Sequence, residues 1–274
     1  MKVQRGVWIV TVIAVVLFLT VWVFPIVWTL VTSVKLPKDV FTYPPSLIFE
    51  PTSANYEQVT AGRRSLVGDL WTSVVIAGST TLLAMLVGLP LAYAFARLRL
   101  RWRNVLGVYT LFTYLIPRIG LVLPHFVILR WLNLTDTHLG LTLVYLSFTL
   151  PLAIWLMVSY CEDLPAELEE AARIDRATRL QAFWRIVLPQ LRGGLAATTI
   201  FVFITAWNEF LFALALGGQN VRPVTVAMYN FISVEQTLWG PLTAAAVIAM
   251  LPVVVLGLLA QKQIVAGLTA GSVK

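Results

Sequence analysis

Long apolar runs alternate with short polar segments along this chain, and six of the runs approach the length that a helix needs to cross a bilayer. Roughly 20 apolar residues suffice for one crossing, and longer runs tilt. The six predicted spans cover residues 7–34, 70–96, 105–129, 139–160, 195–216 and 241–261. We therefore predict an all-α, polytopic membrane protein with six transmembrane helices.

Composition supports a membrane protein. Hydrophobic residues make up 59% of the 274 residues and charged residues only 12%, whereas a soluble domain carries about 25% charged residues. The net charge of +7 is explained by basic residues retained on the cytoplasmic face of the membrane. We therefore expect no nucleic-acid partner.

Candidate chemistry is sparse. The single cysteine, Cys161, and the two histidines, His125 and His138, form no metal-ligand pattern. The chain also lacks the glycine-rich loop that cradles the phosphates of ATP. We expect no bound metal, no cofactor and no catalytic residue, so the chain is predicted not to be an enzyme.

Basic residues fix the predicted orientation. Four arginines, at positions 97, 99, 101 and 103, fall in one short loop, and short loops rich in arginine stay in the cytoplasm. Both termini are then cytoplasmic. The first span follows Lys2 and Arg5 as a signal peptide would, but it is too long and lacks a cleavage site, so we expect an uncleaved anchor.

Two long segments fall on the outer side. Residues 35–69 are rich in turn-forming residues and are expected to be ordered at the outer mouth. Residues 217–240 are polar at both ends and apolar between Val224 and Tyr229. Such a loop reaches into another protein, or it lies back on its own helices; composition leaves both open.

Helix-breaking residues gather in and before spans three to five: Pro117, Gly120, Pro124, Pro151, Gly193 and Gly194. They predict kinks and a polar-lined path, because freed backbone groups need partners within the bundle. Arg118 and Glu209 lie at membrane depth, where a charge faces a cavity or pairs with another charge. Both alternatives stand for this pair.

The most charged segment, the charged insert (162–190), follows the fourth span. Asp163 is expected to cap a helix whose first turn is acidic, and Glu169 is expected to pair with Arg173. The predicted apolar side of this helix is Leu164, Leu168, Ala171 and Ala172. Thr178 and Gln181 predict the capping box of a second helix that Pro189 interrupts. An acidic helix favours a docking surface for a soluble partner over a segment lying on the membrane.

Several motifs resemble one family. Residues Glu170 to Asp175, with Ala177-Thr178, Phe183, Ile186 and Leu188-Pro189, resemble the EAA loop of ABC-importer permeases. Trp207 to Leu214 and the C-terminal end resemble the maltose-type, carbohydrate branch, which includes the smaller maltose permease subunit. Asn55-Tyr56 and Leu134 to Thr137 also match it. One departure is Arg176, where the family usually has glycine; a left-handed backbone there would cost a non-glycine residue roughly 1–2 kcal/mol.

The resemblance and the patterns above together assign roles. We expect an anchor region (1–69) and a core permease region (70–274) that holds the charged insert and a C-terminal tail (262–274). The expected ATPase-coupling residues are Glu169, Glu170, Ala171, Ala172, Asp175, Arg176, Leu188 and Pro189. Those of the tail, which a partner is expected to hold in place, are Gly267, Leu268, Thr269, Ala270 and Gly271. The expected substrate-pathway residues are Trp207, Asn208, Glu209 and Tyr114, and those meeting a binding protein are Gly217, Gly218, Pro223 and Tyr229.

What the resemblance implies is a transmembrane subunit of an ATP-driven, binding-protein-dependent ABC importer in a bacterial or archaeal cytoplasmic membrane. Its partners would be a second permease subunit, two cytoplasmic ABC ATPases that bind ATP and magnesium, and an extracytoplasmic binding protein. The expected substrate is an oligosaccharide or monosaccharide; a polyol or a glycerol phosphate is the alternative. A secondary transporter would show inverted repeats, which the halves lack, and a hydrolase would need His125, His138 and Glu209 to converge.

Overall fold

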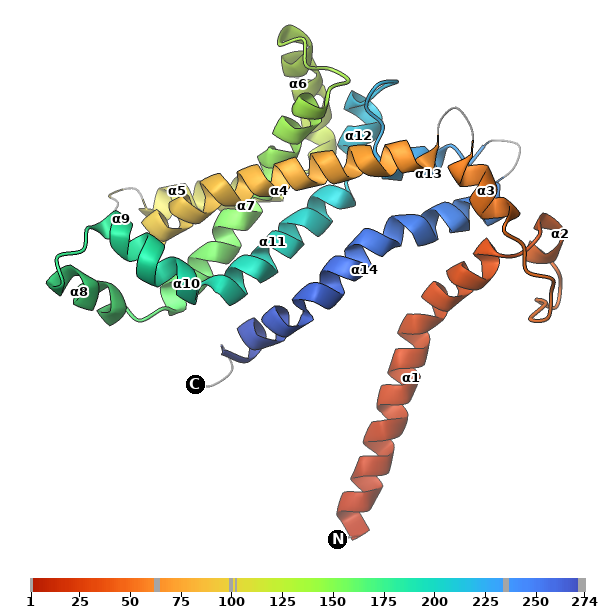
Figure 1. Ribbon diagram of the computed structural model, residues 1–274, viewed down its shortest axis with the longest axis horizontal. Coiled ribbons are helices and arrows are strands. Elements are labelled where there is room, and N and C mark those ends of the chain that lie inside the picture. Colours follow the sequence, from red (N-terminus) through yellow and green to blue (C-terminus); the bar gives the residue numbers. More distant parts are fainter. Residues whose placement is uncertain (1, 62–64, 99–100, 102, 234–236, 271–274) are drawn as a thin grey trace. The chain divides into compact units, whose positions relative to one another are not determined.

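The computed structural model describes residues 2–61, 65–98, 101, 103–233 and 237–270, and these are helical almost throughout (Figure 1). The predicted all-α class is confirmed; an isolated bridge pairs Ile232 with Thr237. The helices are α1 Lys2–Ser33, α2 Pro37–Val40, α3 Ala54–Thr60, α4 Leu66–Arg97, α5 Arg103–Leu115, α6 Arg118–Trp131, α7 His138–Asp163, α8 Glu167–Ile174, α9 Arg179–Ala182, the π-helical turn η1 Phe183–Val187, α10 Leu188–Gln190, α11 Arg192–Trp207, α12 Leu211–Leu216, α13 Val224–Tyr229 and α14 Trp239–Ala270.

Within the described residues, four helices are long and apolar enough to cross a membrane: α1, α4, α7 and α14. Two bent pairs raise the number to six if each pair is one span. The first pair is α5 with α6, bent by 96°, and the second joins Arg179–Gln190 to α11 with a bend of 78°.

Two predicted spans are not single helices. The third, 105–129, breaks before Pro117, which precedes α6; the residue before a proline is driven out of the helical region, so a helix ends there. The fifth, 195–216, stops at Trp207 and resumes as α12 at Leu211. Pro124 and Pro151 instead lie inside continuous helices.

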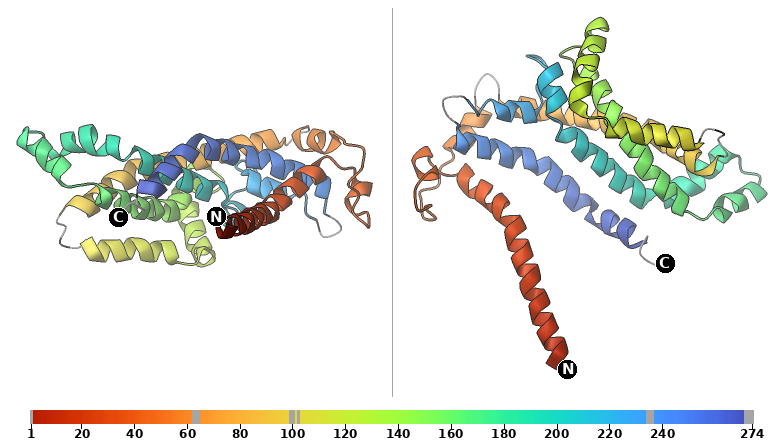
Figure 2. Two further views of the ribbon diagram at one scale, coloured as in Figure 1. Left: turned by 90° about the horizontal axis from the view of Figure 1, so that it is seen from below. Right: turned by 180° about the vertical axis from the view of Figure 1, so that it is seen from behind.

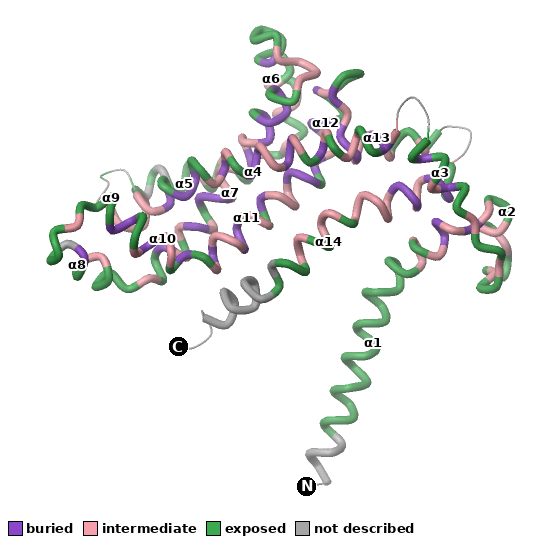
Figure 3. The backbone as a smooth tube through the Cα atoms, in the orientation of Figure 1, coloured by how far each residue is buried: buried purple, intermediate pink, exposed green. Residues whose placement is uncertain are grey.

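The contacts divide the chain into two compact units, and each is described by itself. The first comprises residues 1–68 and 227–251. Most of α1 is exposed (Figure 3). The segment after it is ordered around Lys35, which is buried, donates to the carbonyl of Ser46 at 2.7 Å and lies over the ring of Trp28. The amide of Asn55 donates to the carbonyl of Lys35 at 2.8 Å.

The second unit comprises residues 69–226 and 252–274. Here α5 and α11 both pack against α7, as Figure 2 shows. A small residue lets α11 approach α7 closely. A Cβ on Gly194 of α11 would lie 2.4 Å from the ring of Tyr160 on α7. Gly194, predicted to be a helix breaker, therefore serves close packing in the first turn of α11.

One ion pair joins the two broken spans of this unit. Arg118, the first residue of α6, places Nη1 2.6 Å from Oε2 of Glu209. The other carboxylate oxygen accepts a 3.0 Å hydrogen bond from the backbone N–H of Phe212 in α12, and the guanidinium lies 4.1 Å from the ring centroid of Phe148 on α7. The interhelical pair, one of two alternatives for these charges, is confirmed.

The pair predicts an asymmetric effect of neutralising its members. The Glu209 side chain is 3% exposed and that of Arg118 is 36% exposed. Arg118→Gln leaves a buried carboxylate without its partner, which costs about 3–5 kcal/mol, whereas Glu209→Gln leaves a cation that is only partly buried and costs less. Unfolding of the purified chain in lipid nanodiscs measures both. Arg118→Gln with Glu209→Gln together should be more stable than Arg118→Gln alone, and the opposite order would contradict the pairing.

Arg176 keeps the left-handed backbone that glycine would adopt more readily. Its φ is 60°, and the N–H of Ala177 bonds the carbonyl of Ala172 at 3.0 Å. That bond spans six residues, as in the Schellman motif that closes a helix with a left-handed residue. The turn after α8 thus has a conformation that suits glycine, although arginine occupies the position.

We predict that Arg176→Gly stabilises the end of α8. Removing the side chain relieves a cost of roughly 1–2 kcal/mol, partly offset by the greater entropy of glycine in the unfolded chain. Amide hydrogen exchange over residues 167–174 should slow. Arg179→Gly is the control: it places glycine in the first turn of α9 and should speed exchange there. Unchanged or faster exchange in Arg176→Gly would contradict the strain.

Candidate functional site

The charged insert begins later than its sequence predicts. Asp163 is the last residue of α7 rather than the cap of a new helix, and the carbonyl of Ala166 accepts the first bonds of α8, from Glu169 and Glu170. The α7 pattern of apolar residues simply continues through Cys161, which is buried. The second predicted start is confirmed: Thr178 and Gln181 form a reciprocal capping box.

Pro189 does not interrupt the second helix. The chain widens into η1 just before it, with the N–H of Leu188 bonded to the carbonyl of Phe183, and α10 carries Pro189 in its first turn. A proline lacks an N–H and crowds the carbonyl four residues earlier, here that of Arg185. The wider π turn makes room for the proline ring, so the helical path continues through Pro189.

The second helix of the insert, formed by α9, η1 and α10, packs against the helix bundle. Phe183, Val187 and Leu191 share a core with residues of α4 and α7, and the ring of Phe183 lies 4.8 Å from that of Tyr93 on α4. This contact explains why η1 stays in place although Trp184, the residue that follows Phe183 in η1, is exposed. The insert is thus attached to the helix bundle.

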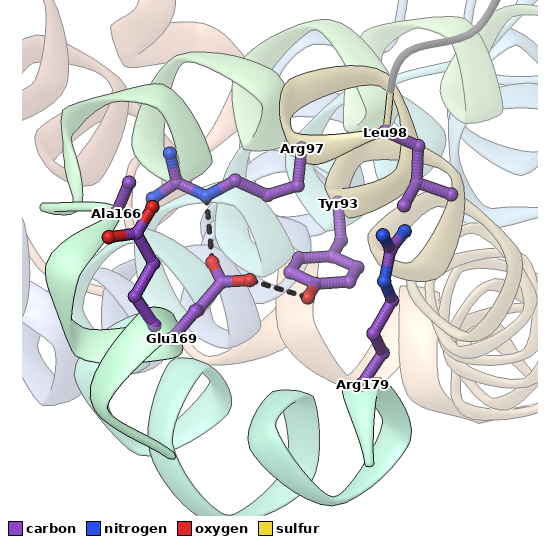
Figure 4. A pocket seen from close by; sticks show the side chains of 7 residues that line it. Tyr93, Arg97, Leu98, Ala166, Glu169 and Arg179 are labelled. Carbon is purple, nitrogen blue, oxygen red and sulfur yellow. Dashed lines mark hydrogen bonds and ion pairs between the residues drawn. The ribbon is translucent and has the colours of Figure 1, made fainter. Parts of the chain in front are cut away.

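Glu169 holds α8 against α4 (Figure 4). One carboxylate oxygen lies 2.8 Å from Nε of Arg97, and the other accepts a 2.7 Å hydrogen bond from the hydroxyl of Tyr93. Arg97 also donates to the carbonyl of Leu164, just after α7. Glu169 thus contacts a residue 72 positions away; the side chain of Arg173, its expected partner, lies outside the described residues. Glu169 orients α8 from the inside.

These side chains line a small cavity of about 150 Å³, with Glu170 and Arg179 at its edge. Figure 4 shows Tyr93 and Arg97 pointing toward Glu169 from α4 and Arg179 approaching from α9. Two acidic and two basic side chains thus meet here. Glu170 itself is exposed, so it differs from its neighbour Glu169 in being available to another molecule.

The outer side of α8 is apolar and open. Leu168, Ala171 and Ile174 recur every third residue and are exposed, Ile174 by 82%. Ala172, expected to share this side, is 5% exposed and faces its own chain. Ile174 was not among the residues expected on this side, although its spacing of three residues from Ala171 indicates that it shares it. We refer to Leu168, Ala171 and Ile174 as the α8 stripe.

The other expected coupling residues fall into two groups. Asp175 and Arg176 are exposed in the turn after α8, whereas Leu188 and Pro189 are half-buried in α10. They do not form one continuous surface with Ala172. Of the expected set, Ala171 belongs to the α8 stripe itself. Glu170, Asp175 and Arg176 are also exposed, in α8 or in the turn after it.

The expected substrate-pathway residues cluster at the two breaks. Trp207 is 4% exposed and stacks on Phe203, with ring centroids 5.6 Å apart. The amide of Asn208 donates to the carbonyl of Ile204, and Glu209 is taken up by its ion pair. Tyr114 is half-exposed near the end of α5. Among the four, Asn208 and Tyr114 retain exposed side chains.

The start of the 217–240 segment lies back on its own chain. Asp136, between α6 and α7, accepts hydrogen bonds from the backbone N–H groups of Asn220 and Val221 at 3.0 and 2.8 Å. A Cβ on Gly218 would lie 2.7 Å from the same carboxylate, so a side chain there would displace the loop. Gly217 ends α12 and bonds the carbonyl of Ala213.

A second attachment follows at α4. Arg222 forms a two-pronged ion pair with Asp69, with Nε 3.0 Å from Oδ1. The hydroxyl of Ser73 accepts a 2.8 Å hydrogen bond from the N–H of Val224. Pro223, between Arg222 and Val224, is buried. For residues 217–226, hereafter the 217–226 loop, these contacts hold the connection on its own helices, and its expected contact with a binding protein stays a prediction. Tyr229, in the other unit, is half-exposed.

The last helix extends into the tail. The helix α14 continues to Ala270 and includes Gly267, Leu268 and Thr269; Gly271 lies outside the described residues. Mid-helix glycine costs about 1 kcal/mol, which the long apolar helix before it offsets. The expectation that a partner holds the tail in place stays a prediction.

No group of three or more histidine, cysteine, aspartate or glutamate side chains suits a metal ion in the described part of the chain. His125 bonds the carbonyl of Leu121 and packs edge-on against Phe212. His138 begins α7. The histidines are accounted for by these positions in the fold.

Solved structures share this architecture. A bacterial ABC transporter for import of the acidic polysaccharide alginate aligns with a TM-score of 0.77 over 96% of this chain and 98% of that one, at 23% identity. The MetNI methionine ABC transporter aligns with a TM-score of 0.61 over 73% of this chain and 95% of that one, at 17% identity. These likenesses establish the fold.

Sequence relatives are closer. The trehalose/maltose transport system permease protein MalG of Thermococcus litoralis is 34% identical over 97% of this chain and 96% of that protein. The trehalose permease protein SugB of Mycobacterium tuberculosis is 36% identical over 91% and 92%. The diacetylchitobiose permease protein DasC of Streptomyces coelicolor is 31% identical over 95% of both.

The model of one protein family matches residues 84–269, a region that contains the charged insert, both broken spans and most of α14. Together with relatives more than 30% identical along nearly the whole chain, this match settles the family. The chain belongs to the inner membrane components of binding-protein-dependent transport systems.

Proposed function

We propose that this chain is the sugar-translocating permease subunit of an ATP-driven importer. The chain has no phosphate-binding loop, so ATP and magnesium would be bound by two partner ABC ATPases on the cytoplasmic side. A second permease subunit would complete the pathway in the cytoplasmic membrane, and an extracytoplasmic binding protein would deliver the substrate. Alternating access would follow ATPase closure through rigid motions of the helices.

The observation that carries the proposal is the α8 stripe on a helix fixed from behind. Glu169 holds α8 against Arg97 and Tyr93, while Ile174 remains 82% exposed. An exposed apolar stripe beside an acidic residue suits a groove in a soluble partner, and a helix held rigidly can transmit that partner's motion to α4. Arg176, Leu188 and Pro189 would support this surface, and residues 267–271 would lie near the ATPases.

A sugar is the substrate that the relatives favour, since they are named for trehalose, maltose and diacetylchitobiose. A sugar site needs hydrogen-bonding and aromatic groups without a free charge. Asn208 and Tyr114 are exposed beside the breaks, and the charges there neutralise each other. A polyol or glycerol phosphate is not favoured by these relatives.

Transport by proteoliposomes tests the proposal. The chain is purified with its second permease subunit and ATPases, and uptake of labelled trehalose, maltose, diacetylchitobiose and glycerol 3-phosphate is measured with liganded binding protein. ATP-dependent accumulation of one of the sugars is expected. Accumulation without ATP, driven by an ion gradient, would contradict the proposal, and accumulation of glycerol 3-phosphate alone would contradict the sugar assignment.

The structure separates two neighbouring alanines. Ala171→Trp should leave folding intact but lower ATPase association and uptake at least tenfold, because the bulky ring lifts α8 from its partner. Ala172→Trp should lower the stability of the chain itself, since Ala172 faces its own core and overpacking costs about 1–3 kcal/mol. Copurification and thermal unfolding measure both effects. Normal uptake with Ala171→Trp would defeat docking at the α8 stripe.

Glu169 and Glu170 are predicted to differ as the two alanines do: one supports the fold of the insert and the other supports docking. Glu169→Ala should speed amide exchange over residues 167–174, because α8 loses its contacts with Arg97 and Tyr93. Glu170→Ala should leave that exchange unchanged and weaken ATPase association, most at low salt, as loss of an exposed charge does. Equal exchange in the two variants would show that Glu169 does not position α8.

A further inference from the structure

Glu209 makes contacts to three different parts of the second unit. Its carboxylate binds Arg118 of α6 at 2.6 Å and the N–H of Phe212 in α12 at 3.0 Å. Its backbone carbonyl accepts a 2.9 Å hydrogen bond from the hydroxyl of Thr225, at the start of α13. One buried residue therefore connects the break at Pro117, the break before α12 and the 217–226 loop.

The loop end of this connection is rigid. Val224, next to Thr225, is fully buried and its N–H is held by Ser73. The preceding residues are held by Asp136 and by the Arg222–Asp69 ion pair. A displacement of the loop therefore cannot be absorbed between Asn220 and Thr225 without breaking one of these bonds. It is passed instead to the carbonyl of Glu209.

The other end is equally constrained. The guanidinium of Arg118 is fixed between the carboxylate and the ring of Phe148, and Phe148 stacks on Phe212 with ring planes 9° apart. Arg118 is the first residue of α6, directly after the 96° bend. A shift of Glu209 therefore acts on the point where the third span changes direction.

We propose that Glu209 is a positioning residue that relays engagement of the 217–226 loop to α6, through Thr225 on one side and Arg118 on the other. This rests on the proposed function, together with the expectation that the liganded binding protein meets this loop at Gly217 and Gly218. The relay gives Glu209 a role other than contact with substrate, in keeping with its burial. Its two links are single contacts, each open to removal by one substitution.

The test is the ATPase activity of the reconstituted complex with and without liganded binding protein. Thr225→Val removes the hydroxyl while keeping the shape of the side chain. We expect the stimulation ratio to fall by roughly two- to thirtyfold, the range that residues within a coupling network produce. The concentration of binding protein that gives half-maximal stimulation should stay the same. A residue that merely shaped the loop would raise that concentration.

Thr205→Val is the matched control. Its hydroxyl donates to the carbonyl of Phe201 within α11, close to the same break, so its loss should leave the ratio unchanged. Thr225→Val is then combined with Arg118→Gln, or with Arg118→Lys if the former fails to assemble. A relay predicts that the double variant is no worse than the arginine variant alone. Multiplicative losses would overturn it.

The outcomes separate the relay from the proposed function. If the wild-type complex shows no stimulation by any liganded binding protein, the proposed function fails. If the wild type is stimulated and Thr225→Val behaves like Thr205→Val, only the relay fails. If Thr225→Val alters half-saturation alone, the residue shapes the docking loop and the relay through Glu209 is also overturned.

Discussion

Every backbone polar group within a bilayer must find its partner inside the protein, and this constraint governs the two broken spans. Each break exposes N–H and carbonyl groups that a continuous helix would pair. At the second break Glu209 accepts from the first turn of α12, and Arg118 neutralises the charge that this introduces. A broken span is thus stabilised by a carboxylate, and the carboxylate by a cation from the other broken span. The two breaks depend on one another.

In the charged insert, outside the spans, a carboxylate paired within the protein again fixes a helix. Glu169 is drawn inward by Arg97 and Tyr93, which leaves Glu170 and the α8 stripe facing outward. Adjacent residues of one motif therefore differ: Glu169 fixes the helix, and Glu170 is exposed, as the proposed docking requires. A surface of this kind is preorganised, so less conformational entropy is lost when a partner binds. Rigidity behind the stripe also lets a pull on α8 reach α4.

Much of the fold was predictable because it is local. Apolar runs set the helices, and the capping box at Thr178 needs only four residues to be recognised. The missed features are tertiary. Glu169 pairs with a residue 72 positions away, and Asp136 binds a loop 84 positions away. The positive φ of Arg176 could be raised from the family's usual glycine but not decided, because an arginine side chain disfavours it; the Schellman bond of the completed helix imposes it.

The ion pair also bears on where the energy for transport enters. A carrier driven by an ion gradient needs a membrane charge that is free to bind and release the ion. Glu209 is 3% exposed and Arg118 already occupies one of its oxygens, so a coupling ion would have to displace that arginine and leave it unpaired beside Phe148. The charges at membrane depth are therefore committed to structure. In the proposed function the driving force enters instead through the α8 stripe, which is exposed in this unit.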